Sequence, residues 1–166
     1  MSAVIEKAPV ITLEEAARLI WREAELLDRH QYKPWLKLWT AGGLYIIPAD
    51  VAAVDYAEVL NIAYDDGPMR EMRVKRLLSG FSMSSAPPAR TVRTLSRFVE
   101  GEAAGAQAIA LRAAMIIVEY KYDRTRVLAA DVDYRIVREA GELRIDRKVV
   151  TFINADDFLH GIGYLL

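Results

Sequence analysis

Several aromatic and acidic side chains could take part in acid–base chemistry or hold a ligand. They are Tyr32, Trp35, Trp39, Tyr64, Asp66, Asp131 and Asp133. A general base needs a perturbed pKa and must reach the substrate proton, and the sequence shows neither. Structural roles explain the same residues, since Trp35 and Trp39 lie four apart on one helix face and favour core packing. Asp66 can cap the helix predicted after it, and Asp131 and Asp133 suit the solvated face of a strand.

Metal chemistry has little support in this sequence. The chain has no cysteine, which excludes disulfides, thiol catalysis and thiolate metal sites. The two histidines, His30 and His160, lie near opposite ends of the chain, and no metal-ligand spacing connects them. His30 ends a predicted helix, where an imidazole suits the negative end of the helix dipole, and His160 lies in the C-terminal tail. We therefore expect no metal or cofactor site in this chain.

A third set of residues suits contact with another protein chain. The interface candidates are Arg73, Arg90, Arg93, Arg97, Phe158 and Tyr164. Arg93 and Arg97 are predicted to share one strand face with Leu95 and Val99, and arginine mixed with apolar side chains is typical of interfaces. Charge for solubility is the alternative for any single arginine. Segment 158–166 is so apolar that it must fold back on its own domain or reach into a neighbour.

Helical signals dominate the N-terminal half of the chain. Thr12 and Glu15 form a capping box, Pro34 suits the first turn of a short helix, and Gly42-Gly43 should end that helix. Asp66 and the proline after Gly67 can start a third helix. The predicted helices span about 12–30, 33–40 and 67–79, and strands are predicted over 44–47 and 54–64.

Alternation typical of strands replaces the helical pattern near residue 90. The predicted strands span 91–99, 106–120, 126–139 and 142–154, with Ala140-Gly141 as a hairpin turn. In the third of these strands one face carries Leu128, Ala130, Val132, Tyr134 and Ile136. Helices followed by long strands predict an α+β domain in which helices cover one face of a strongly bent antiparallel sheet.

Composition limits the class of protein. The chain has 166 residues, 53% hydrophobic and 27% charged, which fits one globular domain. A net charge of −1 gives no basic bias toward nucleic acid or an anionic membrane. No apolar run reaches transmembrane length, and residues 1–10 lack the apolar core of a signal peptide. We expect a flexible arm over 1–11, a single domain over 12–166 and a cytoplasmic location.

Motifs along most of the chain follow a recognisable order and spacing. They are Glu23-Ala24-Glu25-Leu26-Leu27-Asp28, Trp35-Leu36-Lys37-Leu38-Trp39, Tyr64-Asp65-Asp66, then Met69, Arg73, Val74, Arg76 and Leu77, then Pro87-Pro88-Ala89-Arg90-Thr91, and Arg144-Ile145-Asp146-Arg147-Lys148-Val149-Val150. Together they resemble the small (beta) subunit of bacterial aromatic-ring-hydroxylating dioxygenases, which are Rieske non-haem iron oxygenases. The resemblance implies a cone-shaped, cystatin-like roll shared with nuclear transport factor 2 and SnoaL-like proteins, with N-terminal helices packed in a curved sheet.

The resemblance also implies a function. The chain would be a non-catalytic small subunit with a structural role in aromatic compound catabolism, forming a homotrimer within a heterohexamer. Its large (alpha) subunit partner would carry the Rieske [2Fe–2S] cluster and the mononuclear iron. The alternative is a stand-alone cone-fold enzyme of dehydratase, isomerase or cyclase type, or a small-ligand-binding protein. Its pocket between helices and sheet would use Tyr32, Trp35, Trp39, Tyr64, Asp66 and Asp133.

Overall fold

The computed structural model describes residues 10–80, 87–102, 105–155 and 161–166. The elements follow in the order α1 (Leu13–Asp28), α2 (Tyr32–Leu36), β1 (Trp39–Pro48), β2 (Asn61–Asp65), α3 (Gly67–Ser79), β3 (Arg90–Glu100), β4 (Ala108–Lys121), β5 (Arg124–Glu139) and β6 (Glu142–Phe152). The predicted change from helices to long strands near residue 90 is confirmed. Most of the predicted 1–11 arm lies outside the described residues, but its last residue, Ile11, is buried in the core.

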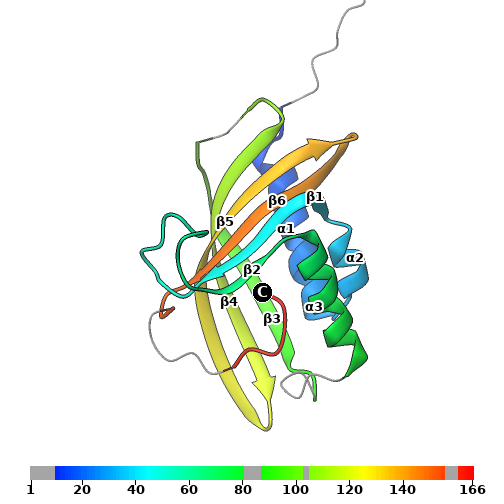
Figure 1. Cartoon of the computed structure of the whole chain (residues 1–166), viewed down its shortest axis with the longest axis vertical. Coiled ribbons are helices and arrows are strands. Elements are labelled where there is room, and N and C mark those ends of the chain that lie inside the picture. Colours follow the sequence, from blue (N-terminus) through cyan, green and yellow to red (C-terminus); the bar gives the residue numbers. More distant parts are fainter. Residues whose placement is uncertain (1–9, 81–86, 103–104, 156–160) are drawn as a thin grey trace, which may run out of the picture.

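The six strands form one curled sheet, in the order β2-β1-β6-β5-β4-β3. The three helices lie along one side of this sheet (Figure 1). Every neighbouring pair is antiparallel except β1 and β6, which run parallel. The expectation of an antiparallel sheet is wrong for that pair. Alternation within a strand shows which residues face the core, but it carries no information on the direction of the neighbouring strand.

The segment from Trp39 to Gly43 corrects one predicted boundary. Gly42 and Gly43 lie inside β1 and do not end a helix, and α2 stops at Leu36. A Cβ atom on Gly43 would lie only 3.0 Å from the main-chain oxygen of Ile145 and 3.0 Å from the Trp39 ring. Glycine is therefore needed here for close packing of strand backbone, a role that sequence alone does not distinguish from a turn.

The segment before β2 corrects another boundary. Residues 49–60 form turns instead of the first part of the predicted strand 54–64, and the strand begins at Asn61. The carboxylates of Asp50 and Asp55 accept hydrogen bonds from the main-chain N–H groups of Ala52 at 2.8 Å and Ala57 at 3.2 Å. Such local bonds favour turns over a sheet ladder, because they satisfy backbone donors two residues away.

The helix caps follow the sequence prediction. The Thr12 side chain accepts from the Glu15 N–H at 3.2 Å, and the Glu15 carboxylate accepts from the Thr12 N–H at 2.9 Å. The Asp66 carboxylate accepts from the Met69 N–H at 3.0 Å and caps α3. The capping box and the Asp66 cap are therefore confirmed, and each satisfies main-chain donors that a helix start leaves free.

Arginines hold α3 against the sheet. Arg70 is buried, donates to the main-chain oxygens of Gly43 and Thr40, and lies 4.2 Å above the centre of the Trp39 ring. The Arg73 guanidinium donates two hydrogen bonds, of 2.5 and 2.9 Å, to the carboxylate of the buried Asp65. Fork-like pairing of this kind combines charge with fixed geometry. Both arginines thus make contacts within the chain.

The core lies between α1 and the inner face of the sheet. The inner residues predicted for β5, from Leu128 to Ile136 at alternate positions, are all buried. Those of β4 include Leu111, Met115 and Ile117. Burial of each large side chain contributes about 1.5–3 kcal/mol, so this alternation is the main source of the fold's stability. Among the described residues, none of the helices has the length and apolar character needed to cross a membrane.

Candidate functional site

Two deeply buried charged groups meet between α1 and β6. Glu23 and Lys148 are each only 1% exposed, and the Lys148 Nζ lies 2.8 Å from a Glu23 carboxylate oxygen. The Trp35 Nε1 and the Tyr134 hydroxyl also donate to this carboxylate, at 3.0 and 2.9 Å. The Glu23 carboxylate therefore has three donors from α2, β5 and β6, which bind the helices to the sheet.

Burial controls the protonation of the groups around Glu23. It lowers the pKa of Lys148, and the neighbouring Glu23 charge opposes this shift. Burial also raises the pKa of Tyr134 well above its ordinary value, with a further contribution from Glu23. Tyr134 thus stays protonated at neutral pH and keeps donating to Glu23. The groups that could do acid–base chemistry are engaged with one another, which suits a structural network better than a base waiting for a substrate.

The segment Gly161–Leu166 completes the interior. Leu165 and Leu166 are buried, and the Lys148 Nζ donates to the main-chain oxygen of Leu166 at 2.7 Å. The Leu166 N–H donates to the Tyr45 hydroxyl at 2.9 Å, and the Arg93 guanidinium donates to the main-chain oxygen of Leu165 at 3.0 Å. Figure 1 shows this segment, in red, lying between the sheet and the helices. Residues 161–166 therefore fold back on their own domain.

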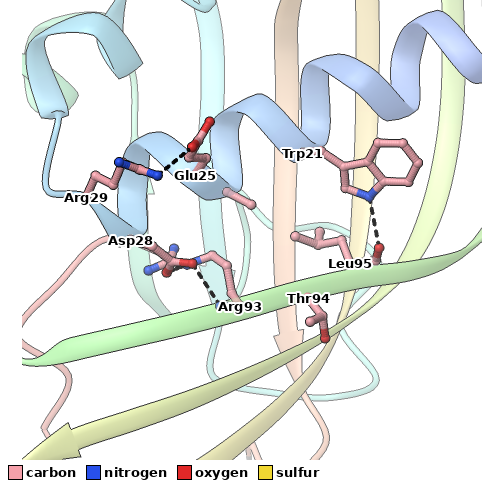
Figure 2. Close-up of a pocket in the computed structure, with 8 residues that line it drawn as sticks. Trp21, Glu25, Asp28, Arg29, Arg93, Thr94 and Leu95 are labelled. Atoms are coloured by element: carbon pink, nitrogen blue, oxygen red, sulfur yellow. Dashed lines mark hydrogen bonds and ion pairs between the residues drawn. The ribbon is translucent and has the colours of Figure 1, made fainter.

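A groove of about 590 Å³ lies between α1 and the edge strand β3 (Figure 2). The Asp28 carboxylate accepts from the Arg93 Nε at 2.8 Å and from the Arg93 N–H at 2.9 Å. The Trp21 Nε1 donates to the Leu95 main-chain oxygen at 3.1 Å. Two α1 side chains thus occupy main-chain groups on the free edge of the sheet, which protects that edge from pairing with other strands.

A second groove, of about 560 Å³, lies on the outer face of the sheet beside the 49–60 turns. Arg97 and Asp131 form an ion pair there, and both side chains are about half exposed, at 57% and 49%. Burial raises the pKa of the neighbouring Asp133, and the charges of Arg112 and Arg147 partly offset this shift. The groove therefore presents charged groups of both signs.

The position of Arg97 shows that the predicted strand face shared by Arg93 and Arg97 is wrong. Arg93 points inward to Asp28, whereas Arg97 pairs with Asp131 on the outer face. The register of β3 against β4 shifts between Ser96 and Val99, and Arg97 has a φ of 55°. A bulge inserts an extra residue and reverses the alternation after it. Arg93 and Arg97 therefore do not share a face.

The outer face also carries an apolar strip, formed by Val92, Ile116, Val118 and Val127. Val92 pairs with Val118, and Val118 pairs with Val127, so the strip crosses three neighbouring strands. All four side chains are among the exposed large hydrophobic residues of the chain. Contiguous exposed apolar surface of this kind marks contact with another molecule more often than an isolated exposed valine does.

The predicted pocket residues do not line one pocket: three lie in the core, and the other three lie elsewhere. Tyr32, Trp35 and Trp39 are buried, and the two indole rings pack edge to face with centres 5.4 Å apart. Tyr64 lies partly exposed on β2, Asp66 caps α3, and Asp133 faces the outer groove.

The interface candidates are equally dispersed. Arg73 and Arg93 pair within the chain, Arg90 is exposed and lies over the Tyr120 ring, and the Tyr164 ring lies 6.0 Å from the Arg93 guanidinium. Phe158 lies outside the described residues, and the placement of Arg97 is given above.

Sequence reasoning missed the Glu23–Lys148 pair. A signal was present, because Glu23 lies beside Ile20, Ala24 and Leu27 in the apolar stripe of α1. Lys148 likewise stands at an inward position of β6, two residues before Val150. A charge at a core position in two elements predicts a buried pair.

His30, which was considered as a metal ligand, lies with its Nε2 3.1 Å from the Ala89 main-chain oxygen.

Comparisons with known proteins agree with this architecture. The beta subunit of benzoate 1,2-dioxygenase from Burkholderia mallei superposes with a TM-score of 0.76 at 22% identity, over 93% of this chain and 98% of that one. An NTF2-like protein with a cystatin-like fold from Novosphingobium aromaticivorans superposes with a TM-score of 0.58 at 12% identity, over 85% and 81%. The predicted α+β, cystatin-like fold is therefore confirmed.

Sequence relatives define the family. The small oxygenase component of the p-cumate 2,3-dioxygenase system of Pseudomonas putida is 31% identical in a match that covers 89% of this chain and 89% of that one. The family described as ring hydroxylating beta subunit matches residues 22–156. The chain therefore belongs to the family of ring-hydroxylating dioxygenase beta subunits, the small subunits of these enzymes.

Proposed function

We propose that this chain acts as a non-catalytic assembly subunit, which supports an iron-bearing large (alpha) subunit in the breakdown of an aromatic compound. One observation carries this proposal: the space between helices and sheet is filled by the chain's own residues. Glu23, Lys148 and Tyr134 bond to one another, and Leu165 and Leu166 pack beside them. A stand-alone enzyme of the same fold would need this space for its substrate.

The redox centres belong on the partner in this proposal. A Rieske cluster needs two cysteine and two histidine ligands. This chain has no cysteine, and in the described ranges no three His, Cys, Asp or Glu side chains gather as metal ligands. The described residues therefore fit neither a Rieske cluster nor a mononuclear iron. The lack of cysteine also suits the cytoplasmic location that we propose.

We further propose that the outer apolar strip is buried in a homotrimer, within a heterohexamer that contains three large subunits. The strip extends over β3, β4 and β5, and arginines such as Arg90 lie at its border. Apolar centres with arginine-rich surroundings are typical of protein interfaces. Identical chains favour closed symmetric rings, and a threefold ring meets that condition.

The proposal is tested by expression with and without the large subunit encoded nearest to this chain in its genome. We expect the two chains to copurify, the isolated small chain to carry no stoichiometric iron, and oxygen consumption with aromatic substrates to require both. Stoichiometric iron in the isolated chain, or turnover by it alone, would contradict the proposal.

Self-association is tested separately by light scattering. The Val127→Lys substitution places a charge in the apolar strip and should shift the trimer toward monomer. Val54→Lys is the matched control, because Val54 is 89% exposed in the 49–60 turns, away from the strip. Equal masses for the two variants and the unchanged chain would show that the strip is not the trimer interface.

A further inference from the structure

Three arginines from three different strands border the groove of about 560 Å³ on the outer face of the sheet. Arg97 of β3 and Arg112 of β4 line this outer groove, and Arg147 of β6 lines a smaller hollow of about 140 Å³ beside it. Arg112 and Asp133 line both, so the groove and the hollow adjoin. Glu100 lines the hollow alone. The strands therefore bring basic side chains that are distant in sequence to one concave surface.

Two of these arginines have no ion-pair partner. The charges of Arg112 and Arg147 both act to lower the pKa of Asp133, so both guanidinium groups lie near its carboxylate. In the described part of the chain, however, neither of these two side chains forms an ion pair or a hydrogen bond. Arg97, by contrast, pairs with Asp131. Two guanidinium groups thus remain available to an added anion.

The backbone of β3 is distorted at this groove. Its register shifts between Ser96 and Val99, and Arg97 has a φ of 55°, a region that residues other than glycine rarely adopt. The bulge turns Arg97 to the outer face, where it pairs with Asp131. One carboxylate of the groove is thereby occupied, and Asp133 alone is left near the other two arginines.

The 49–60 turns add an aromatic and apolar wall. Burial raises the pKa of the half-buried Tyr56, the Asp133 charge raises it further, and the Arg147 charge opposes the shift. The Tyr56 ring therefore lies near the same charged groups. The apolar lining residues of the groove are Val51, Ala53 and Val99. A ligand with a charged end and an apolar body would find a partner here for each part.

We propose that the outer groove binds a small organic acid of one negative charge. Arg112 and Arg147 hold its carboxylate, and Tyr56 and Val99 contact its apolar body. A guanidinium can donate two parallel hydrogen bonds to one carboxylate, so arginine is suited to select this group. Asp133 disfavours a second negative charge on the ligand. The site is built within one chain, so this inference does not rest on the proposed assembly role.

Three planar probes of similar size test the charge selectivity of the groove on the full-length chain alone. Benzoate is an anion, benzamide is neutral and benzamidine is a cation at neutral pH. Amide chemical shifts from an NMR titration report both the dissociation constant and the residues affected. We expect benzoate to bind at least about tenfold more tightly than either other probe, because it alone accepts charge-assisted hydrogen bonds from two arginines. No saturable binding of benzoate, or equal binding of benzamide, would overturn the proposal.

Arginine substitutions then locate the site. Arg112→Gln and Arg147→Gln should each weaken benzoate binding about tenfold, the effect of losing hydrogen bonds to a charged group. Both side chains are exposed, so the fold should tolerate either change. Arg124→Gln is the matched control, because Arg124 is exposed and pairs with Lys121 at the hairpin end of β5, away from the groove. Equal effects of all three substitutions would contradict a site at the groove.

Asp133→Asn should change the affinity in the opposite direction. The substitution removes the carboxylate near Arg112 and Arg147, so benzoate no longer competes with a neighbouring negative charge. We expect benzoate to bind severalfold more tightly to this variant than to the unchanged chain, with little change for benzamide. A general disturbance of the groove would weaken both probes. Unchanged or weaker benzoate binding would show that these two arginines do not hold the carboxylate.

Discussion

The two faces of the curled sheet differ in the exposure of their ion pairs and of their apolar side chains. On the inner face, Glu23 with Lys148 and Asp28 with Arg93 form ion pairs in which the basic partner is almost completely buried. On the outer face, the Arg97–Asp131 pair is about half exposed, and the strip of Val92, Ile116, Val118 and Val127 faces outward. A single strand, β3, supplies an arginine to each face.

This difference separates residues that hold the fold from residues that are free for another role. A buried charge must keep its partner, because an unpaired charge in the interior costs several kcal/mol. An exposed pair gains little, since water and salt screen it. The inner face should therefore tolerate few substitutions, whereas the outer face should tolerate many and show their effects in assembly.

The largest effect is expected from breaking the Glu23–Lys148 pair. Glu23→Leu leaves Lys148 buried without its carboxylate and should lower the free energy of unfolding by about 3–5 kcal/mol. Urea denaturation measures this change. Adding Lys148→Met removes the unpaired charge and should recover part of the loss, although Trp35 and Tyr134 still lack their acceptor. A double variant as unstable as the sum of the two single variants would contradict this account.

Adjacent residues of β4 provide a matched test of the two faces. Ile117 is fully buried on the inner face, and Ile116 is 49% exposed on the outer face. Ile117→Ala should cost about 2–5 kcal/mol, because it removes buried methylene groups and leaves a cavity. Ile116→Ala should change the stability of the monomer by less than about 0.5 kcal/mol. Similar losses in thermal or urea unfolding would remove the distinction between the faces.

Local patterns predicted those parts of the fold that depend on neighbours in sequence. The Thr12–Glu15 capping box, the Asp66 cap and the inward residues of β5 all follow from spacing within one element. The parallel pairing of β1 with β6 does not, because it joins segments that are far apart in the chain. Hydrogen bonds between strands that are distant in sequence depend on tertiary packing, which the hydrophobic periodicity of a single segment does not reveal.

The candidate site was harder to predict than the fold for the same reason. Glu23 and Lys148 are 125 positions apart, and only the folded sheet brings them into contact. The outward turn of Arg97 depends on a bulge that adds one residue to β3. Nothing in the types of residue around Arg97 distinguishes that bulge from continued alternation, so the predicted shared face with Arg93 failed.

A smaller effect is expected at the outer ion pair. A double-mutant cycle of Arg97→Ala and Asp131→Ala should give a coupling energy of about 0.2–1 kcal/mol, which falls further in high salt. The same cycle on Arg93 and Asp28 should give a larger value that salt changes little, since the Arg93 side chain is 1% exposed. Equal coupling energies for the two pairs would mean that burial does not separate the faces.

The smallest effect, at Asp133, depends on pH. Burial raises the pKa of Asp133 above its ordinary value of 3.8, with partial compensation by Arg112 and Arg147. Between 3.8 and the raised value the folded chain binds more protons at this group than the unfolded chain does. The contribution of Asp133 to stability therefore falls as the pH rises through that window.

Asp133→Asn removes this dependence. The variant should match the unchanged chain in acid and become more stable than it by about 0.5 kcal/mol near neutral pH, the scale of most substitutions outside the core. Urea unfolding between about pH 4 and pH 7 measures the difference. Asp131→Asn is the matched control, and it should show no such gain because it deprives Arg97 of its partner. A difference that is constant with pH, or a loss at neutral pH, would show that the charges of Arg112 and Arg147 outweigh the burial of Asp133.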